Sequence, residues 1–132
     1  TIMESIFSKI VAGDIPAYKV AETVQYLAFL DVSPLVEGHV LVIPKIQIDY
    51  LFDMDSEEYV GLMMFAQIVA KGLKKAIPCN RIGLAVMGME VPHAHIHLIP
   101  INSMDDMNFS HPKLKFSDEK LESIAERIRA EL

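Results

Sequence analysis

Residues 91–100 read Val91-Pro92-His93-Ala94-His95-Ile96-His97-Leu98-Ile99-Pro100. Histidine occupies every second position from His93 to His97, and small or aliphatic residues lie between. This period of two predicts a β-strand over residues 93–99. Successive side chains of a strand point to opposite faces, so His93, His95 and His97 are predicted to share one face. Imidazole can act as acid, base, nucleophile or metal ligand near neutral pH, which makes this face a candidate site.

The composition indicates a small folded protein with an acidic surface. The chain has 132 residues, of which 52% are hydrophobic, and we expect a single domain over residues 1–132. Its net charge of -6 argues against nucleic acid and against an anionic membrane surface as partners. No apolar run approaches the roughly 20 residues of a membrane span. With one cysteine, Cys79, and no secretory signal pattern, we expect a cytoplasmic location.

The remaining patterns predict an α+β protein in which helices are segregated from an antiparallel five-stranded sheet. Alternating or continuously apolar runs predict the strands, and apolar residues at helical spacing predict one long helix and two shorter ones. The predicted strands are 18–22, 24–30, 38–44, 81–87 and 93–99, and the predicted helices are 4–12, 55–76 and one that begins near 117.

The long predicted helix also suggests an oligomer. Its core stripe has the i, i+3, i+4 spacing, but Met63, Met64 and Phe65 widen that stripe beyond what one sheet face requires. We therefore expect a homodimer. The alternative is a monomer in which the helix is buried over a wide face.

From the residues alone, two functions of the three histidines remain open. A His-x-His pair on a strand can hold zinc or iron, but it needs a third ligand, and no acidic residue follows His97 before Asp105. Alternatively, the middle histidine is a nucleophile that attacks an anionic electrophile such as a phosphate ester. His111, alone in a predicted loop, favours neither function.

Four blocks of the sequence together resemble the histidine triad family of nucleotide hydrolases and transferases. The blocks occur in the family's order, and the resemblance covers residues 5 to about 101. They are Ile6-Phe7-Ser8-Lys9-Ile10-Val11-Ala12-Gly13-Asp14-Ile15-Pro16-Ala17, Leu27-Ala28-Phe29-Leu30-Asp31-Val32-Ser33-Pro34, Gly38-His39-Val40-Leu41-Val42-Ile43-Pro44-Lys45 and His93-Ala94-His95-Ile96-His97-Leu98-Ile99.

The resemblance implies a covalent mechanism without a metal or other cofactor. His95 would attack the α-phosphorus of a nucleotide and form a nucleotidyl-histidine intermediate, which water would then hydrolyse. His39 would hold the other ring nitrogen of His95, directly or through a backbone group. His97 would contact the phosphate oxygens, and His93 would order the strand. The family usually forms dimers in which two sheets join into one.

The resemblance also implies a binding site for a purine nucleotide, such as a phosphoramidate or a dinucleoside polyphosphate. Asp31 would accept hydrogen bonds from the ribose hydroxyls. The base pocket would be lined by Phe7, Ile10, Phe29, Val32 and Leu41.

The sequence departs from the family in two places. Some members bind zinc through Cys-x-x-Cys, but this chain has Ser5-Ile6-Phe7-Ser8 there. The loop before the triad is shortened, so that Met87 stands where a phosphate-contacting Asn is expected and Glu90 where a Ser is expected. Glu90 would favour a cationic leaving group, unless it is simply solvated or paired with a lysine. The altered loop also leaves an alternative function, a nucleotide-binding regulatory module with weak or no turnover.

Overall fold

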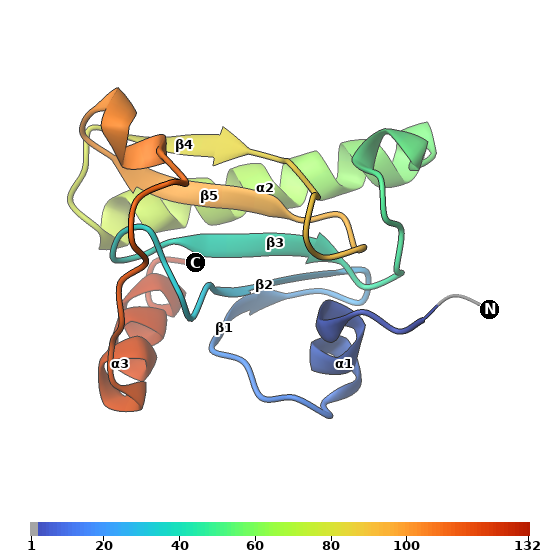
Figure 1. Cartoon of the computed structure of the whole chain (residues 1–132), viewed down its shortest axis with the longest axis horizontal. Coiled ribbons are helices and arrows are strands. Elements are labelled where there is room, and N and C mark those ends of the chain that lie inside the picture. Colours follow the sequence, from blue (N-terminus) through green and yellow to red (C-terminus); the bar gives the residue numbers. More distant parts are fainter. Residues whose placement is uncertain (1–2) are drawn as a thin grey trace.

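The computed structural model describes residues 3–132. Within them, five strands form one antiparallel sheet in the order β1-β2-β3-β5-β4 (Figure 1). The predicted α+β class is confirmed. The strands are β1 (Lys19–Glu22), β2 (Tyr26–Leu30), β3 (Val40–Pro44), β4 (Arg81–Ala85) and β5 (Ile96–Ile101).

Polar caps determine where the three α-helices begin. The side chains of Ser5, Asp55 and Ser117 each accept a hydrogen bond from a backbone N–H in the first turn, which satisfies a donor that the helix leaves unpaired. The helices are α1 (Ile6–Ala12), α2 (Ser56–Ala76) and α3 (Asp118–Arg129), and short 3-10 turns occur at η1 (Leu51–Asp53) and η2 (Met104–Met107). All three predicted α-helices are found within about two residues of their predicted starts.

Apolar residues on both faces of the sheet explain why its central strands are buried throughout. On one face, the strands pack against α2 and α3 and form the larger core. On the other face, Leu27, Phe29, Leu41 and Ile43 pack against the short helix α1. In Figure 1, α2 runs along the sheet behind β5 and β4, and α1 lies next to the β1–β2 hairpin. The face with α1 is only partly covered by a helix, and this leaves room for a cleft.

The predicted strand 93–99 is wrong at its start. Strand β5 begins at Ile96, and residues 93–95 form an irregular bend before it. There, the N–H of His93 donates to the carbonyl of Val91 at 2.8 Å, and the N–H of Ala94 donates to the carbonyl of Ile48 at 2.6 Å. These bonds replace a strand ladder, so the three histidines do not form one row on a strand.

Of the three residues that widen the apolar stripe of α2, only one is largely exposed. Phe65 is buried and stacks on Tyr26 with ring centroids 5.7 Å apart, so it belongs to the core of the chain itself. Met63 is half-buried, whereas Met64 is 60% exposed. Among the described residues, no helix combines the length and the hydropathy that crossing a membrane requires.

Candidate active site

Three segments that are distant in sequence meet on the α1 face of the sheet. Asp31 follows β2, and its N–H donates to the carbonyl of His39 at 3.0 Å, which continues the β2–β3 pairing. His39 precedes β3 and follows Gly38, whose φ of +89° favours glycine. His97 lies in β5, in register with Leu41 of β3. Strand pairing therefore brings Asp31, His39 and His97 together.

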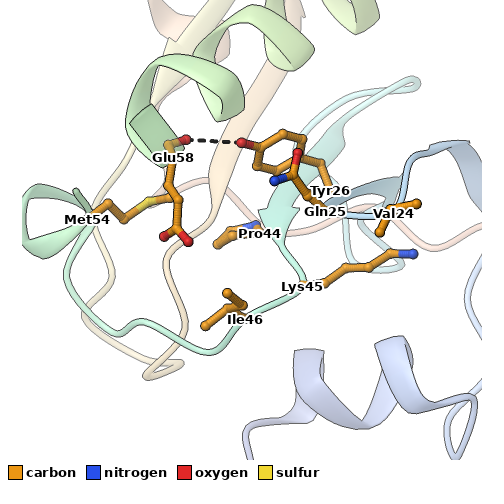
Figure 2. A pocket seen from close by; sticks show the side chains of 8 residues that line it. All are labelled: Val24, Gln25, Tyr26, Pro44, Lys45, Ile46, Met54 and Glu58. Atoms are coloured by element: carbon orange, nitrogen blue, oxygen red, sulfur yellow. Dashed lines mark hydrogen bonds between the residues drawn. The ribbon is translucent and has the colours of Figure 1, made fainter. Parts of the chain in front are cut away.

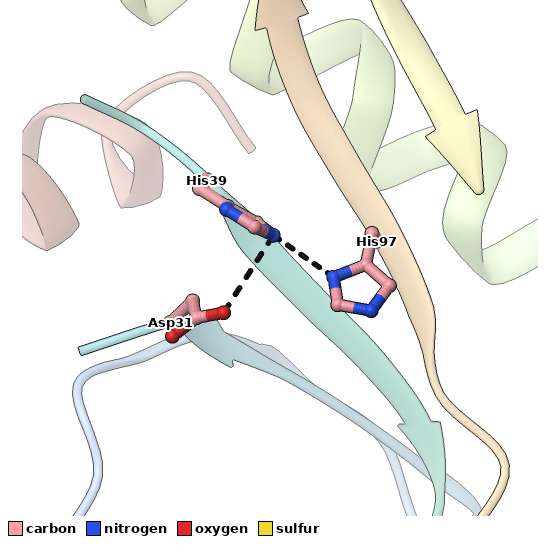
Figure 3. Close-up of side chains that lie close together, drawn as sticks. All are labelled: Asp31, His39 and His97. Atoms are coloured by element: carbon pink, nitrogen blue, oxygen red, sulfur yellow. Dashed lines mark hydrogen bonds and ion pairs between the residues drawn. The ribbon is translucent and has the colours of Figure 1, made fainter. Parts of the chain in front are cut away.

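The hydrogen bonds around His39 and His97 assign a proton to each ring. The backbone N–H of Leu35 donates to Nδ1 of His39 at 3.1 Å, so this nitrogen carries a lone pair. The proton of neutral His39 is then on Nε2, which lies 2.9 Å from Nδ1 of His97 (Figure 3). His97 accepts at Nδ1 and keeps its own proton on Nε2. Its remaining N–H is thus a donor for a ligand in the cleft.

His95 has the opposite tautomer. Its Nδ1 lies 2.7 Å from the carbonyl oxygen of His93, and because a carbonyl only accepts, Nδ1 carries the proton. The lone pair of neutral His95 is therefore on Nε2. The ring packs edge-on against Phe7 and His97, at 5.0 and 5.1 Å between centroids. Of the two expected links between His39 and His95, the direct hydrogen bond is not found, because Nε2 of His39 meets His97 and the backbone carbonyl of His93 holds the His95 ring.

The ring of His93 is fully buried, and both of its nitrogens are hydrogen-bonded. Its Nε2 donates to the carbonyl of Pro44 at 2.8 Å, so its Nδ1 accepts from the hydroxyl of Ser5 at 2.7 Å. Ser8 and the amide oxygen of Gln47 complete this network, with Ser8 Oγ donating to Gln47 Oε1 at 2.7 Å. The network fixes the backbone of His93, whose carbonyl in turn orients His95.

A cleft of about 220 Å³ opens over the histidines. Its walls come from the end of β2, the start of β3, the bend before β5, the short loop after β4 and the segment after η2. The lining residues are Asp31, His39, Met87, Gly88, Met89, Glu90, Val91, His95, His97, Phe109 and Lys113.

Sequence reasoning missed Phe109 and Lys113. The ring of Phe109 lies edge-on to His97, with centroids 5.0 Å apart, and Lys113 Nζ is 5.7 Å from the centroid of Phe109. Both belong to a polar stretch without periodicity, so no pattern pointed to the cleft. They reach it because the chain leaves β5 and folds back, and the N–H of Leu114 donates to the carbonyl of Pro34 at 2.8 Å.

A second, mostly apolar cavity of about 160 Å³ lies between α1 and the sheet. All five residues that the resemblance assigns to the base pocket line it, namely Phe7, Ile10, Phe29, Val32 and Leu41. Asp31 lines both this cavity and the histidine cleft. The two hollows are thus neighbours that share one carboxylate.

Burial controls the charges of the cleft. Desolvation lowers the pKa of His39 to about 3 and that of His97 to about 4, so both rings are neutral at pH 7. Burial raises the pKa of the Asp31 carboxyl, and the hydrogen bond from the N–H of Ser33 at 2.9 Å partly opposes this rise. The neutral histidines agree with the tautomers that the hydrogen bonds assign.

Asp31, His39 and His97 form a group that could in principle hold a metal ion (Figure 3). Two nitrogens bound to one tetrahedral zinc would lie about 3.3 Å apart, given Zn–N bonds of about 2.0–2.1 Å. Here, Nε2 of His39 and Nδ1 of His97 are 2.9 Å apart and are joined by a hydrogen bond. At the position where some family members bind zinc through Cys-x-x-Cys, Ser5 and Ser8 present hydroxyls, which structural zinc sites do not use. Neither arrangement fits zinc.

We therefore expect no stoichiometric metal in the purified protein. The two histidine nitrogens that zinc would need are already engaged in a hydrogen bond between neutral rings. Elemental analysis of protein purified without chelators or added metal checks this expectation. About one zinc or iron per chain, with activity lost on its removal and restored on its return, would contradict it.

A third hollow, of about 150 Å³, lies at the end of β3 beside the first turn of α2 (Figure 2). Tyr26 closes one side and donates to the carbonyl of Glu58 at 3.2 Å. Lys45, which also lines it, is paired with Glu22 at 2.8 Å. This hollow shares no lining residue with the histidine cleft and contains no histidine. The histidine cleft is therefore the candidate active site.

Fold and site together define an α+β protein with a histidine cluster on one face of an antiparallel sheet. A family model described as the HIT domain matches residues 12–104. The adenosine 5'-monophosphoramidase hnt1 of Schizosaccharomyces pombe is 34% identical over 135 aligned positions, covering 98% of this chain and 99% of that protein. The corresponding HNT1 of Saccharomyces cerevisiae is 38% identical over 99 positions, covering 72% of this chain and 61% of that protein.

The likeness extends to solved structures. A HIT-like protein from Bartonella henselae, described as involved in cell-cycle regulation, superposes with a TM-score of 0.86 at 32% identity, covering 97% of this chain and 96% of that chain. The chain belongs to the histidine triad (HIT) family.

Proposed function

We propose that this protein is a nucleotide hydrolase that cleaves purine nucleoside phosphoramidates at the α-phosphate and releases a nucleoside monophosphate. The observation that carries the proposal is Asp31, which lines both the apolar cavity and the histidine cleft. A base in the cavity would place the ribose hydroxyls at Asp31 and the 5'-phosphate among the histidines. Two relatives named as adenosine 5'-monophosphoramidases support the same reaction class.

The tautomers support a role for each histidine. His95 presents a lone pair at Nε2, which attacks the α-phosphorus to form a nucleotidyl-histidine, while the P–N bond to the amine breaks and the amine leaves with a proton taken up from solvent. His97 donates its Nε2–H to a phosphoryl oxygen, where negative charge builds up. His39 holds His97 in the donating tautomer. Water then cleaves the P–N bond to His95 and restores the free ring.

The proposal is tested by turnover of a substrate panel. The panel contains adenylyl and guanylyl amidates together with dinucleoside polyphosphates, and the readout is release of the nucleoside monophosphate. We expect amidates of both purines to be cleaved. Binding of the monophosphate without turnover of any substrate would instead identify a nucleotide-binding regulatory module.

Our proposal also includes a cytoplasmic location, which rests on the single cysteine, Cys79.

We expect phosphoramidates with a cationic amine to be cleaved better than dinucleoside tetraphosphates. Glu90 lines the histidine cleft, so its carboxylate repels a polyphosphate chain and attracts an amine. Two unit charges about 5 Å apart interact by about 3 kcal/mol at a dielectric of about 20. Because Glu90 is exposed, solvent reduces this effect, and we expect a difference of roughly tenfold in discrimination.

The measurement is kcat/KM for both substrate types in the wild type and in Glu90→Gln. Glu126→Gln, an exposed change on α3, is the matched control for loss of one negative charge. The discrimination should shrink in Glu90→Gln only. Equal discrimination in the two variants would remove Glu90 from the argument, and a wild-type preference for the tetraphosphate would refute the expectation.

We also propose that the protein is a homodimer that joins two sheets at β4. Strand β4 lies at an edge of the sheet, and Leu84 on it is 47% exposed. Beside it, α2 exposes Val60, Met64 and Ile68 at a spacing of four residues, an apolar stripe that no part of the described chain covers. A stripe of this kind is typical of a surface buried by a partner.

Light scattering at micromolar concentration should give about twice the chain mass of 14.8 kDa. Met64→Glu should shift the protein toward the monomer, because it buries a charge in the proposed interface. Met104→Glu, at a residue that is 92% exposed on η2, should leave the dimer intact. A wild-type monomer would rule out the dimer.

A further inference from the structure

The histidine cleft is poor in positive charge for a site that would bind an anionic nucleotide. Two carboxylates, Asp31 and Glu90, line it. Hydrogen bonds leave an accepting lone pair on Nδ1 of His39 and of His97, so these two rings are neutral. Neither the two carboxylates nor these two rings supply a permanent positive charge to a phosphate.

Lys113 is the one lysine or arginine among the residues that line the cleft, within the described part of the chain. It comes from the segment after η2, and Nζ donates to the carbonyl of Phe109 at 2.8 Å. Nζ also lies over the ring of Phe109, which packs edge-on against His97 and His39. These contacts hold the ammonium of Lys113 at the wall of the cleft that His39 and His97 also line.

We propose that Lys113 recognises the phosphate of the bound nucleotide and is the residue that makes the cleft selective for an anion. The inference rests on the proposed function and adds a residue to it. An ammonium has three N–H donors, and the bond to Phe109 uses one of them. The others can turn toward phosphoryl oxygens on the flexible side chain of lysine.

The electrostatics of the cleft agree with this placement. Burial dominates the lowered pKa of His39 and of His97, but the positive charge of Lys113 contributes in the same direction at both rings. At Asp31, where burial raises the pKa, the charge of Lys113 acts in opposition. The positive charge of Lys113 therefore acts on Asp31, His39 and His97, three of the groups that would surround the ribose and the phosphate.

Binding of AMP and of adenosine to Lys113→Gln separates anion recognition from packing. Calorimetry should show AMP affinity reduced about five- to tenfold, as for loss of one partly exposed ion pair, with adenosine affinity unchanged. Lys113→Arg keeps the charge and should stay within about threefold of the wild type. Lys115→Gln, an exposed lysine that does not line the cleft, should bind AMP normally. The salt dependence of AMP binding should weaken in Lys113→Gln alone.

Equal weakening of AMP and adenosine in Lys113→Gln would overturn the inference, since it would show that Lys113 only supports Phe109. Unchanged AMP affinity would overturn it as well. A wild type that binds AMP but hydrolyses no substrate would refute the proposed function, and the AMP affinities of the variants would still decide the role of Lys113. A wild type that binds neither AMP nor adenosine would overturn both.

Discussion

Replacing His95 with alanine is expected to reduce turnover by at least about a thousandfold, because the proposed mechanism then loses its nucleophile and with it the covalent route. His95 lines the cleft and carries the lone pair of its neutral ring on Nε2, and no neighbouring histidine offers an equivalent one. His97 presents an N–H there, and both ring nitrogens of His93 are engaged. The measurement is the rate of monophosphate release from an adenylyl amidate.

Two further measurements distinguish loss of chemistry from loss of structure. His95→Ala should still bind AMP and should unfold near the wild-type temperature, because the ring lies at the wall of a cleft. In the wild type, rapid quenching at alkaline pH followed by mass spectrometry should detect one adenylyl group on His95. Near-normal activity of His95→Ala together with an inactive His93→Ala would show that the roles are assigned wrongly.

Lowering the pH from 7 to 5 is expected to remove about 3 to 4 kcal/mol from the free energy of unfolding. Burial holds the pKa of His39 at about 3 and that of His97 at about 4, against an unfolded value of about 6.5. Between these values, the unfolded chain binds more protons than the folded one. Stability therefore falls as the pH drops below about 6.5, by about 2 kcal/mol per histidine at pH 5.

Denaturant unfolding at pH 7 and pH 5 measures this loss. His39→Gln removes one of these two titrating rings, so its loss between the two pH values should be about 2 kcal/mol smaller than that of the wild type. His111→Gln is the control, because His111 is exposed and pairs with Asp105 far from the buried pair. Its loss should match the wild type. Equal stability of the wild type at both pH values would contradict the burial argument.

Local patterns in the sequence were sufficient for the elements, and the resemblance of four blocks to a known family indicated most of the site. Apolar residues at helical spacing predicted the three helices, and alternating or continuously apolar runs predicted the five strands, because these signals depend on neighbouring residues alone. Asp31 and the five apolar residues of the base pocket were implied by the family resemblance, and these six residues line the cavities in the structure. The family assignment followed from the same blocks.

Other features depend on contacts between segments that are distant in the sequence, and only the tertiary structure decided them. The bend at His93 follows from a backbone bond to Ile48 and a side-chain bond to Ser5, which no period of two can reveal. The proton positions on His95 and His97 depend on which group each Nδ1 meets. Phe109 and Lys113 reach the cleft because the chain folds back after β5. A local pattern specifies the side chains that are available, whereas packing between segments sets their tautomers, their charges and what they face.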